Sequence, residues 1–145
     1  MKRRSLLYLA ISLTVFRTSS LQKVNAQQRR GITRRVQFAP GASFTVINGS
    51  VHLGNQDTYI FRANKGQEII ADVTWKGERV NPPNNNDLAD IQGLSGFTFI
   101  TPDGKSYEHP QNDTFAATVT GDYKVIIAQP YRLSNPRYTF KLTIR

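Results

Sequence analysis

The segment from Asp57 to Val73 constrains the fold most, because it contains two short runs in which apolar and polar residues alternate. A two-residue period is typical of β-strands that bury one face. Tyr59 and Phe61 share one face of the first run. After a turn that ends in Gly66-Gln67, the same period continues in Ile69, Ala71, Val73 and Trp75. The segment therefore predicts a β-hairpin within a packed sheet.

The first 26 residues resemble a secretory signal peptide. Lys2-Arg3-Arg4 precedes an apolar run of 11 residues from Leu6 to Phe16, and Val24-Asn25-Ala26 suits cleavage. This run is too short to cross a bilayer as a helix, which takes about 20 residues, and no later segment is longer. We expect residues 1–26 to be removed on export, either by general secretion or by the twin-arginine route, since Arg3-Arg4 also fits that loose pattern.

The excess of positive charge is confined to the start of the chain. The formal charge is +9, but from Val36 onward ten basic residues accompany ten acidic ones. Arg29, Arg30, Arg34 and Arg35 fall within residues 27–35, where we expect a basic, flexible leader or, alternatively, a tether to anionic surface polymer or lipid. A neutral domain lacks the broad basic stripe that nucleic acid binding requires. The lack of cysteine excludes disulfides and thiolate chemistry, and suits a bacterial periplasmic or secreted protein.

Eight short strands are predicted after the leader. They are Phe44–Leu53, Thr58–Ala63, Glu68–Trp75, Gly96–Thr101, Lys105–Glu108, Thr114–Val119, Tyr123–Gln129 and Tyr138–Ile144. One-sided apolar rows in the later strands supply a core: Phe97, Phe99, Phe115, Ala117, Val119, Tyr123, Val125, Ile127, Tyr138, Phe140, Leu142 and Ile144. We therefore expect residues 36–145 to form one all-β domain, a single antiparallel β-sandwich of about eight strands with a jelly-roll-like arrangement.

The stretch from Lys76 to Leu94 breaks the regular spacing of strands. Pro82-Pro83 excludes a ladder-paired strand there, and loops beyond about 12–15 residues are usually functional or disordered. Its oxygen-bearing side chains are Asn84, Asn86, Asp87 and Asp90. We expect no metal or other cofactor, with calcium at Asp87 and Asp90 as the alternative, because the glycine and terminal glutamate of the helix–loop–helix calcium loop are absent.

Several motifs follow one another in a fixed order along the predicted domain. They are Gly49, Asp57-Thr58-Tyr59-x-Phe61-x-Ala63-x-Lys65-Gly66-Gln67, Phe97-x-Phe99-x-x-Pro102-Asp103-Gly104, Thr120-Gly121-Asp122-Tyr123-x-Val125 and Tyr138-x-Phe140-x-Leu142. This set resembles the bacterial pre-peptidase C-terminal domain. Together with Val36-x-Phe38-x-x-Gly41 and Gln129, it is also similar to the periplasmic inhibitors of goose-type lysozyme. The resemblance implies an exported, non-catalytic binding protein with a β-sandwich fold.

Two loops are candidate surfaces for a protein partner, which we expect to be a lysozyme or another extracytoplasmic enzyme. One is Lys76–Leu94, and the other is Pro130–Arg137, which contains two residue types common at interface hot spots. A rigid loop that fills an enzyme's cleft is enough for inhibition. The expected partner-binding residues are Tyr131, Arg132, Asn84, Asn86 and Asp87.

A protein that binds carbohydrate, cell-wall peptidoglycan or another cell surface is the alternative function. Sugar rings stack on exposed aromatic side chains, and Trp75 is the best candidate, with Tyr107 and Tyr131 behind it. Trp75 also continues the apolar row of its strand, so burial is the competing interpretation. Catalysis is not expected, because neither His52 nor His109 lies in a nucleophile or metal motif.

Overall fold

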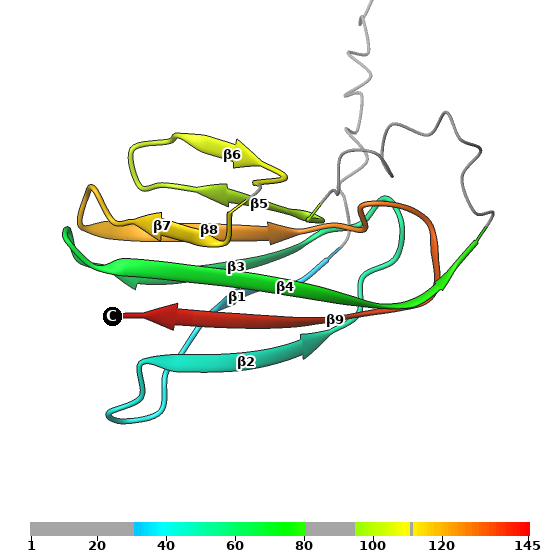
Figure 1. Cartoon of the computed structure of the whole chain (residues 1–145), viewed down its shortest axis with the longest axis horizontal. Coiled ribbons are helices and arrows are strands. Elements are labelled where there is room, and N and C mark those ends of the chain that lie inside the picture. The colour runs from blue at the N-terminus through cyan, green and yellow to red at the C-terminus, as the bar shows by residue number, and fades with distance from the viewer. Residues whose placement is uncertain (1–30, 81–94, 111) are drawn as a thin grey trace, which may run out of the picture.

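The computed structural model describes residues 31–80, 95–110 and 112–145, and these residues form two β-sheets with no helix among them (Figure 1). The part of the chain described in this way contains no helix long and apolar enough to cross a membrane. The expected signal peptide, residues 1–26, lies outside the described residues, as do residues 27–30 of the expected leader.

The described residues contain nine strands, one more than the sequence predicts. The five-stranded sheet has the order β1 (Thr33–Arg35), β3 (Asp57–Ala63), β8 (Gly121–Ile127), β5 (Phe97–Ile100) and β6 (Ser106–Glu108). The four-stranded sheet has the order β2 (Phe44–Gly49), β9 (Leu133–Ile144), β4 (Glu68–Arg79) and β7 (Thr114–Ala116). Consecutive strands alternate between the two sheets except for β5 and β6, which are neighbours in one sheet.

The hairpin predicted for Asp57–Val73 is wrong. β3 pairs with β8 and β1, whereas β4 pairs with β9 and β7, so the turn after Ala63 carries the chain from one sheet to the other. The predicted faces are nevertheless confirmed, because Tyr59, Phe61 and Ile69 are buried and Arg62 is exposed. Two strands that bury one face each can pair side by side or face each other across a core, and their alternation is the same in both cases.

The last three residues assigned to a flexible leader are a strand. Thr33–Arg35 forms β1, which pairs in parallel with β3, and this is the one parallel pair among the described strands. The Arg35 guanidinium donates hydrogen bonds of 3.2 and 2.5 Å to the Asp122 carboxylate of β8. This interaction holds the pKa of Asp122 below its usual range. Backbone pairing and this ion pair together hold a segment that has no buried side chain of its own.

β9 begins earlier than predicted, at Leu133 rather than at Tyr138. Its register with β4 shifts between Lys76 and Glu78, where Asn135 and Pro136 of β9 lie opposite the single residue Gly77. A proline cannot donate a ladder hydrogen bond, and a bulge accommodates it within a strand. The segment Pro130–Arg137, predicted as a loop, is therefore mostly the first half of β9.

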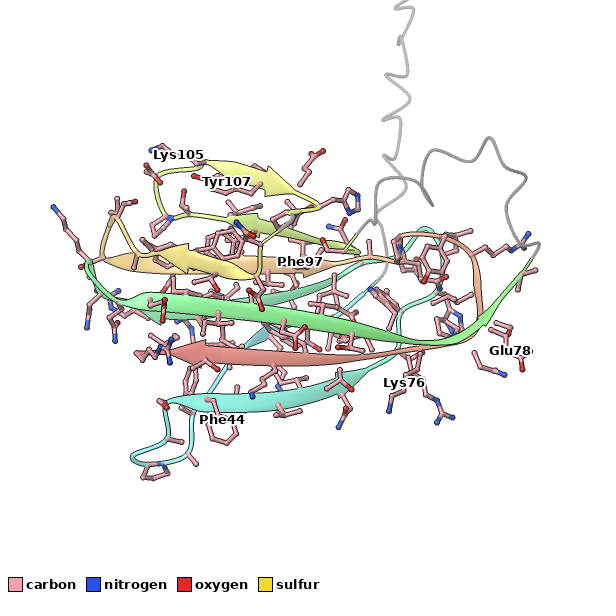
Figure 2. All side chains as sticks on the ribbon, in the orientation of Figure 1. Phe44, Lys76, Glu78, Phe97, Lys105 and Tyr107 are labelled. Carbon is pink, nitrogen blue, oxygen red and sulfur yellow. The ribbon has the colours of Figure 1, made fainter. Side chains whose placement is uncertain are left out.

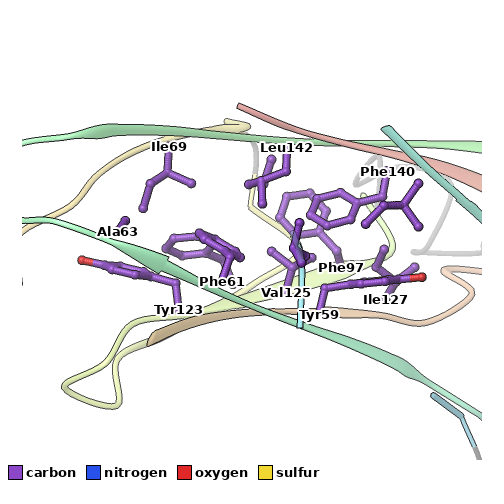
Figure 3. Close-up of a cluster of buried hydrophobic side chains, with 14 of the residues drawn as sticks. Tyr59, Phe61, Ala63, Ile69, Phe97, Tyr123, Val125, Ile127, Phe140 and Leu142 are labelled. Atoms are coloured by element: carbon purple, nitrogen blue, oxygen red, sulfur yellow. The ribbon is translucent and has the colours of Figure 1, made fainter. Parts of the chain in front are cut away.

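The core lies between the two sheets, and rings from both inner faces meet there (Figure 3). Tyr59 of β3 packs on Phe140 of β9 with ring centroids 5.3 Å apart, and Phe99 of β5 stacks on Phe115 of β7 at 3.8 Å. The predicted rows supply this core with one exception. Val119 is 36% exposed, because β7 ends at Ala116 and Val119 falls in the connection to β8.

One buried polar group lies at the edge of the core. The Tyr138 hydroxyl donates to Asp57 Oδ2 at 2.5 Å and is 2.7 Å from the Tyr59 hydroxyl. Asp57 Oδ1 accepts a hydrogen bond from the backbone N–H of Ile32 at 3.0 Å. Because the hydroxyl hydrogen of Tyr138 is used in the hydrogen bond to Asp57, the Tyr59 hydroxyl is the donor in the hydrogen bond to Tyr138. Burial, and then the hydrogen bond to Asp57, raise the pKa of Tyr138 far above its ordinary value, and burial raises the pKa of Tyr59.

Truncation of a core side chain on β8 should destabilise the fold far more than truncation of an outward side chain on the same strand. Ile127 is fully buried, and we expect Ile127→Ala to lower the free energy of unfolding by about 2–5 kcal/mol, the usual range for such cavities. Lys124 is exposed, and Lys124→Ala should change it by less than about 0.5 kcal/mol. Chemical denaturation of the two variants and the wild type measures both values. Equal midpoints for the two variants would contradict this sandwich.

The buried tyrosines should make stability fall in alkaline solution. A tyrosine in the unfolded chain loses its proton near pH 10, whereas folded Tyr138 keeps it, since its pKa is raised. Below pH 10 Tyr138 is protonated in both the folded and the unfolded chain, so it adds no pH dependence to the free energy of unfolding. Above pH 10 only the unfolded chain releases the proton, so the free energy of unfolding decreases by about 1.4 kcal/mol per pH unit for this residue. Urea denaturation between pH 8.5 and 11 should show a shallower decline for Tyr138→Phe, and an unchanged slope would refute the assignment.

Candidate functional site

Tyr131 and Arg132 lie in the short connection between β8 and β9. The Arg132 side chain is exposed and Tyr131 is half-buried. The backbone carbonyl of Arg132 accepts a hydrogen bond of 3.1 Å from the N–H of Val80, the residue that follows β4. We call residues 128–132 the β8–β9 corner.

The side chain of Gln129 holds this corner in place. Its Nε2 donates to the carbonyl of Val51 at 2.7 Å, and its Oε1 accepts from the N–H of Leu133 at 3.0 Å. The Ser134 hydroxyl, at the start of β9, donates to the carbonyl of Glu78 on β4 at 3.2 Å. A backbone that hydrogen bonds to neighbouring segments already hold loses little further conformational entropy when a partner binds. The corner therefore presents the Arg132 side chain from a fixed backbone.

The other expected partner-binding residues, Asn84, Asn86 and Asp87, lie in residues 81–94, outside the described residues, as does Asp90 of the calcium alternative. Their roles stay predictions. Among the residues that the structure does describe, no group of three or more His, Asp, Glu or Cys side chains is placed to hold a metal ion.

Trp75, in the second half of β4, makes the contacts of a core residue. Its ring is half-buried and meets the ring of Tyr138 edge-on, with centroids 5.5 Å apart. Its Nε1–H donates to the carbonyl of Ser95 at 3.3 Å. A Cβ placed on Gly96 would lie 2.4 Å from the indole nitrogen, so Gly96 is packed directly against it. An indole held on its edge and by its N–H offers little free face for a sugar ring.

Tyr107 lies on the edge strand β6 and keeps 45% of its surface exposed (Figure 2). Its ring packs on Phe115 of β7 and on Phe99 of β5, with centroids 6.0 and 6.3 Å apart. It therefore covers the side of the core between β6 and β7. The structure does not bring Tyr107 and Trp75 into a common row: Tyr107 packs with Phe99 and Phe115, whereas Trp75 packs with Tyr138.

A small open pocket lies where β2 ends, and sequence reasoning missed it. Its volume is about 240 Å³, and it is lined by Asn48, Gly49, Lys76, Arg137, Tyr138 and Thr139. Lys76 and Arg137 come together only because β4 and β9 pair in the register that sets them directly opposite each other. No local pattern in the sequence signals this pairing, because Arg137 lies in a segment that reads as a loop.

A comparison with solved structures finds proteins of similar fold. No protein-family model matches the sequence, and no curated protein matches it either. The structure is similar to that of PliG from Aeromonas hydrophila, described as a periplasmic lysozyme inhibitor of g-type lysozyme, with a TM-score of 0.56 and 18% identity. The match covers 80% of this chain and 98% of PliG.

A mutant of Escherichia coli PliG matches with a TM-score of 0.55 and 18% identity, over 80% of this chain and all of that one. PliG from Salmonella Typhimurium matches with a TM-score of 0.51 and 17% identity, again over 80% of this chain. At these identities the likeness shows a shared fold. The resemblance to the pre-peptidase C-terminal domain stays a prediction, since no family model supports it.

Proposed function

We propose that this chain is an exported, non-catalytic protein that binds and inhibits a lysozyme, with a goose-type lysozyme as the first candidate. The observation that supports this most is the shared fold, which extends over 98–100% of the length of the periplasmic inhibitors it matches. A periplasmic location and cleavage of residues 1–26 belong to the same proposal.

The β8–β9 corner is the surface through which we propose that the partner binds. Arginine and tyrosine are enriched at interface hot spots, and the corner presents Arg132 exposed beside Tyr131. The hydrogen bonds of Gln129 to Val51 and Leu133 support this choice, because a prearranged corner loses little entropy on binding. Sugar stacking is less well supported, since the indole of Trp75 packs on Tyr138 and Gly96.

Inhibition assays against lysozymes of different types test this function. The purified protein should inhibit a goose-type lysozyme in a dose-dependent manner at sub-micromolar concentration, measured by the clearing of peptidoglycan suspensions. Arg132→Ala should raise the inhibition constant by at least about tenfold, as expected for a hot-spot residue. Arg62→Ala is the matched control, because Arg62 is an exposed arginine on the five-stranded sheet, and it should leave inhibition unchanged.

Two results would overturn the proposal. One is a folded protein that inhibits no lysozyme in the panel, and the other is cleavage of peptidoglycan by the purified protein itself. If Arg132→Ala and Arg62→Ala weakened inhibition equally, the protein would still be an inhibitor, but the β8–β9 corner would not be its binding surface.

A further inference from the structure

The pocket at the end of β2 contains two cations that face each other. Lys76 of β4 and Arg137 of β9 are directly opposite in the register, and both line the pocket. Figure 2 shows Lys76 beyond the end of β2. Like charges at directly opposed positions of a sheet destabilise it. An anion bound between them would remove this repulsion.

No carboxylate of the described residues forms an ion pair with either cation. The ion pairs among the described residues are Arg35–Asp122, Lys105–Asp103 and Arg145–Glu68. The chain from Val36 onward has equal numbers of basic and acidic residues, so two opposed cations do not follow from a generally basic surface. The pocket is therefore a local concentration of positive charge in a neutral domain, which suits a single anionic group.

Two uncharged polar side chains complete the lining. The Thr139 hydroxyl donates to Oδ1 of Asn48 at 3.0 Å. This bond uses the threonine proton and the amide oxygen, and it leaves the amide N–H donors of Asn48 and the oxygen lone pairs of Thr139 for a ligand. A donor next to an acceptor, on two adjacent strands, suits the hydroxyl groups of a sugar.

The size and the local structure select among anions. A volume of about 240 Å³ lies below the roughly 300–1,000 Å³ of cofactor and drug pockets, and it exceeds what one acidic side chain would fill. It accommodates one sugar ring. Phosphate sites usually add the backbone N–H groups of a helix N-terminus, and the described residues contain no helix.

We propose that this pocket binds a monosaccharide that carries a carboxylate. The carboxylate lies between Lys76 and Arg137, where arginine can form a two-fold hydrogen bond with it, and the ring hydroxyls lie at Asn48 and Thr139. This site is separate from the β8–β9 corner and does not depend on the proposed inhibition of lysozyme.

A titration with four matched small molecules tests the proposal. The ¹⁵N-labelled protein is titrated with glucuronate, with glucose, with glucose 6-phosphate and with acetate, and amide shifts are followed by NMR. Glucuronate should give saturable shifts at Lys76, Arg137 and their neighbours, with a dissociation constant at least about tenfold below those of the other three. Added salt should weaken the binding, because the attraction is electrostatic.

Matched variants assign the binding to the two cations. Lys76→Gln and Arg137→Gln should each weaken glucuronate about tenfold or more, as expected for loss of one charge-assisted hydrogen bond. Lys124→Gln removes an exposed charge from the other sheet and should change nothing. Thermal unfolding should show that both pocket variants remain folded, because neither side chain belongs to the core.

Several outcomes would overturn the proposal. Absence of saturable shifts with glucuronate at millimolar concentrations would remove the site. If acetate bound as tightly as glucuronate, the pocket would be a general anion site. If glucose bound as tightly, the two cations would have no role in binding. If glucose 6-phosphate bound more tightly, the preferred ligand would carry a phosphate and not a carboxylate. An equal effect of Lys124→Gln would place the binding elsewhere.

Discussion

Tyr138 is the residue on which the packing of the two sheets depends. Its ring lies between Gly49 of β2 and Trp75 of β4 in the register, and a Cβ on Gly49 would come within 2.2 Å of that ring. Across the core, its hydroxyl contacts Asp57 and Tyr59 of β3. A buried carboxylate needs such a partner, because an unpaired one costs several kcal/mol. This one side chain thus requires glycine at position 49 of β2 and links the four-stranded sheet to β3 of the other sheet.

The same interaction also holds the segment that leads into β1. Asp57 accepts from Tyr138 with one oxygen and from the backbone N–H of Ile32 with the other. The polar network therefore ties the segment that leads into β1, which has no buried side chain, to a core of large rings. Aromatic side chains bury the most area per residue, and here they meet across the sheets at Tyr59–Phe140 and Phe99–Phe115.

The sequence predicts the faces of the strands well and their partners poorly. Alternation in Tyr59, Phe61 and Ile69 reports which side chains are buried, and that depends only on the local period. Whether β3 pairs with β4 or faces it depends on contacts with β8 and β9, which lie far along the chain.

The sequence does not predict β1, because backbone pairing and the Arg35–Asp122 ion pair hold this strand and it has no row of apolar residues. Tyr131 and Arg132 could be singled out by residue type. Lys76 and Arg137, in contrast, meet only through a strand register that shifts at the bulge directly beside them.

The charge distribution limits how this protein can recognise anything. From Val36 onward the charges cancel, so long-range steering toward a charged partner is weak, and attraction acts mainly within a Debye length of about 10 Å. Binding must then rely on contacts made after encounter, which govern dissociation more than association. A rigid sandwich suits that requirement. Gln129 fixes the backbone of the β8–β9 corner through bonds to Val51 and Leu133, and paired strands set Lys76 against Arg137, so both surfaces keep their geometry without a partner present.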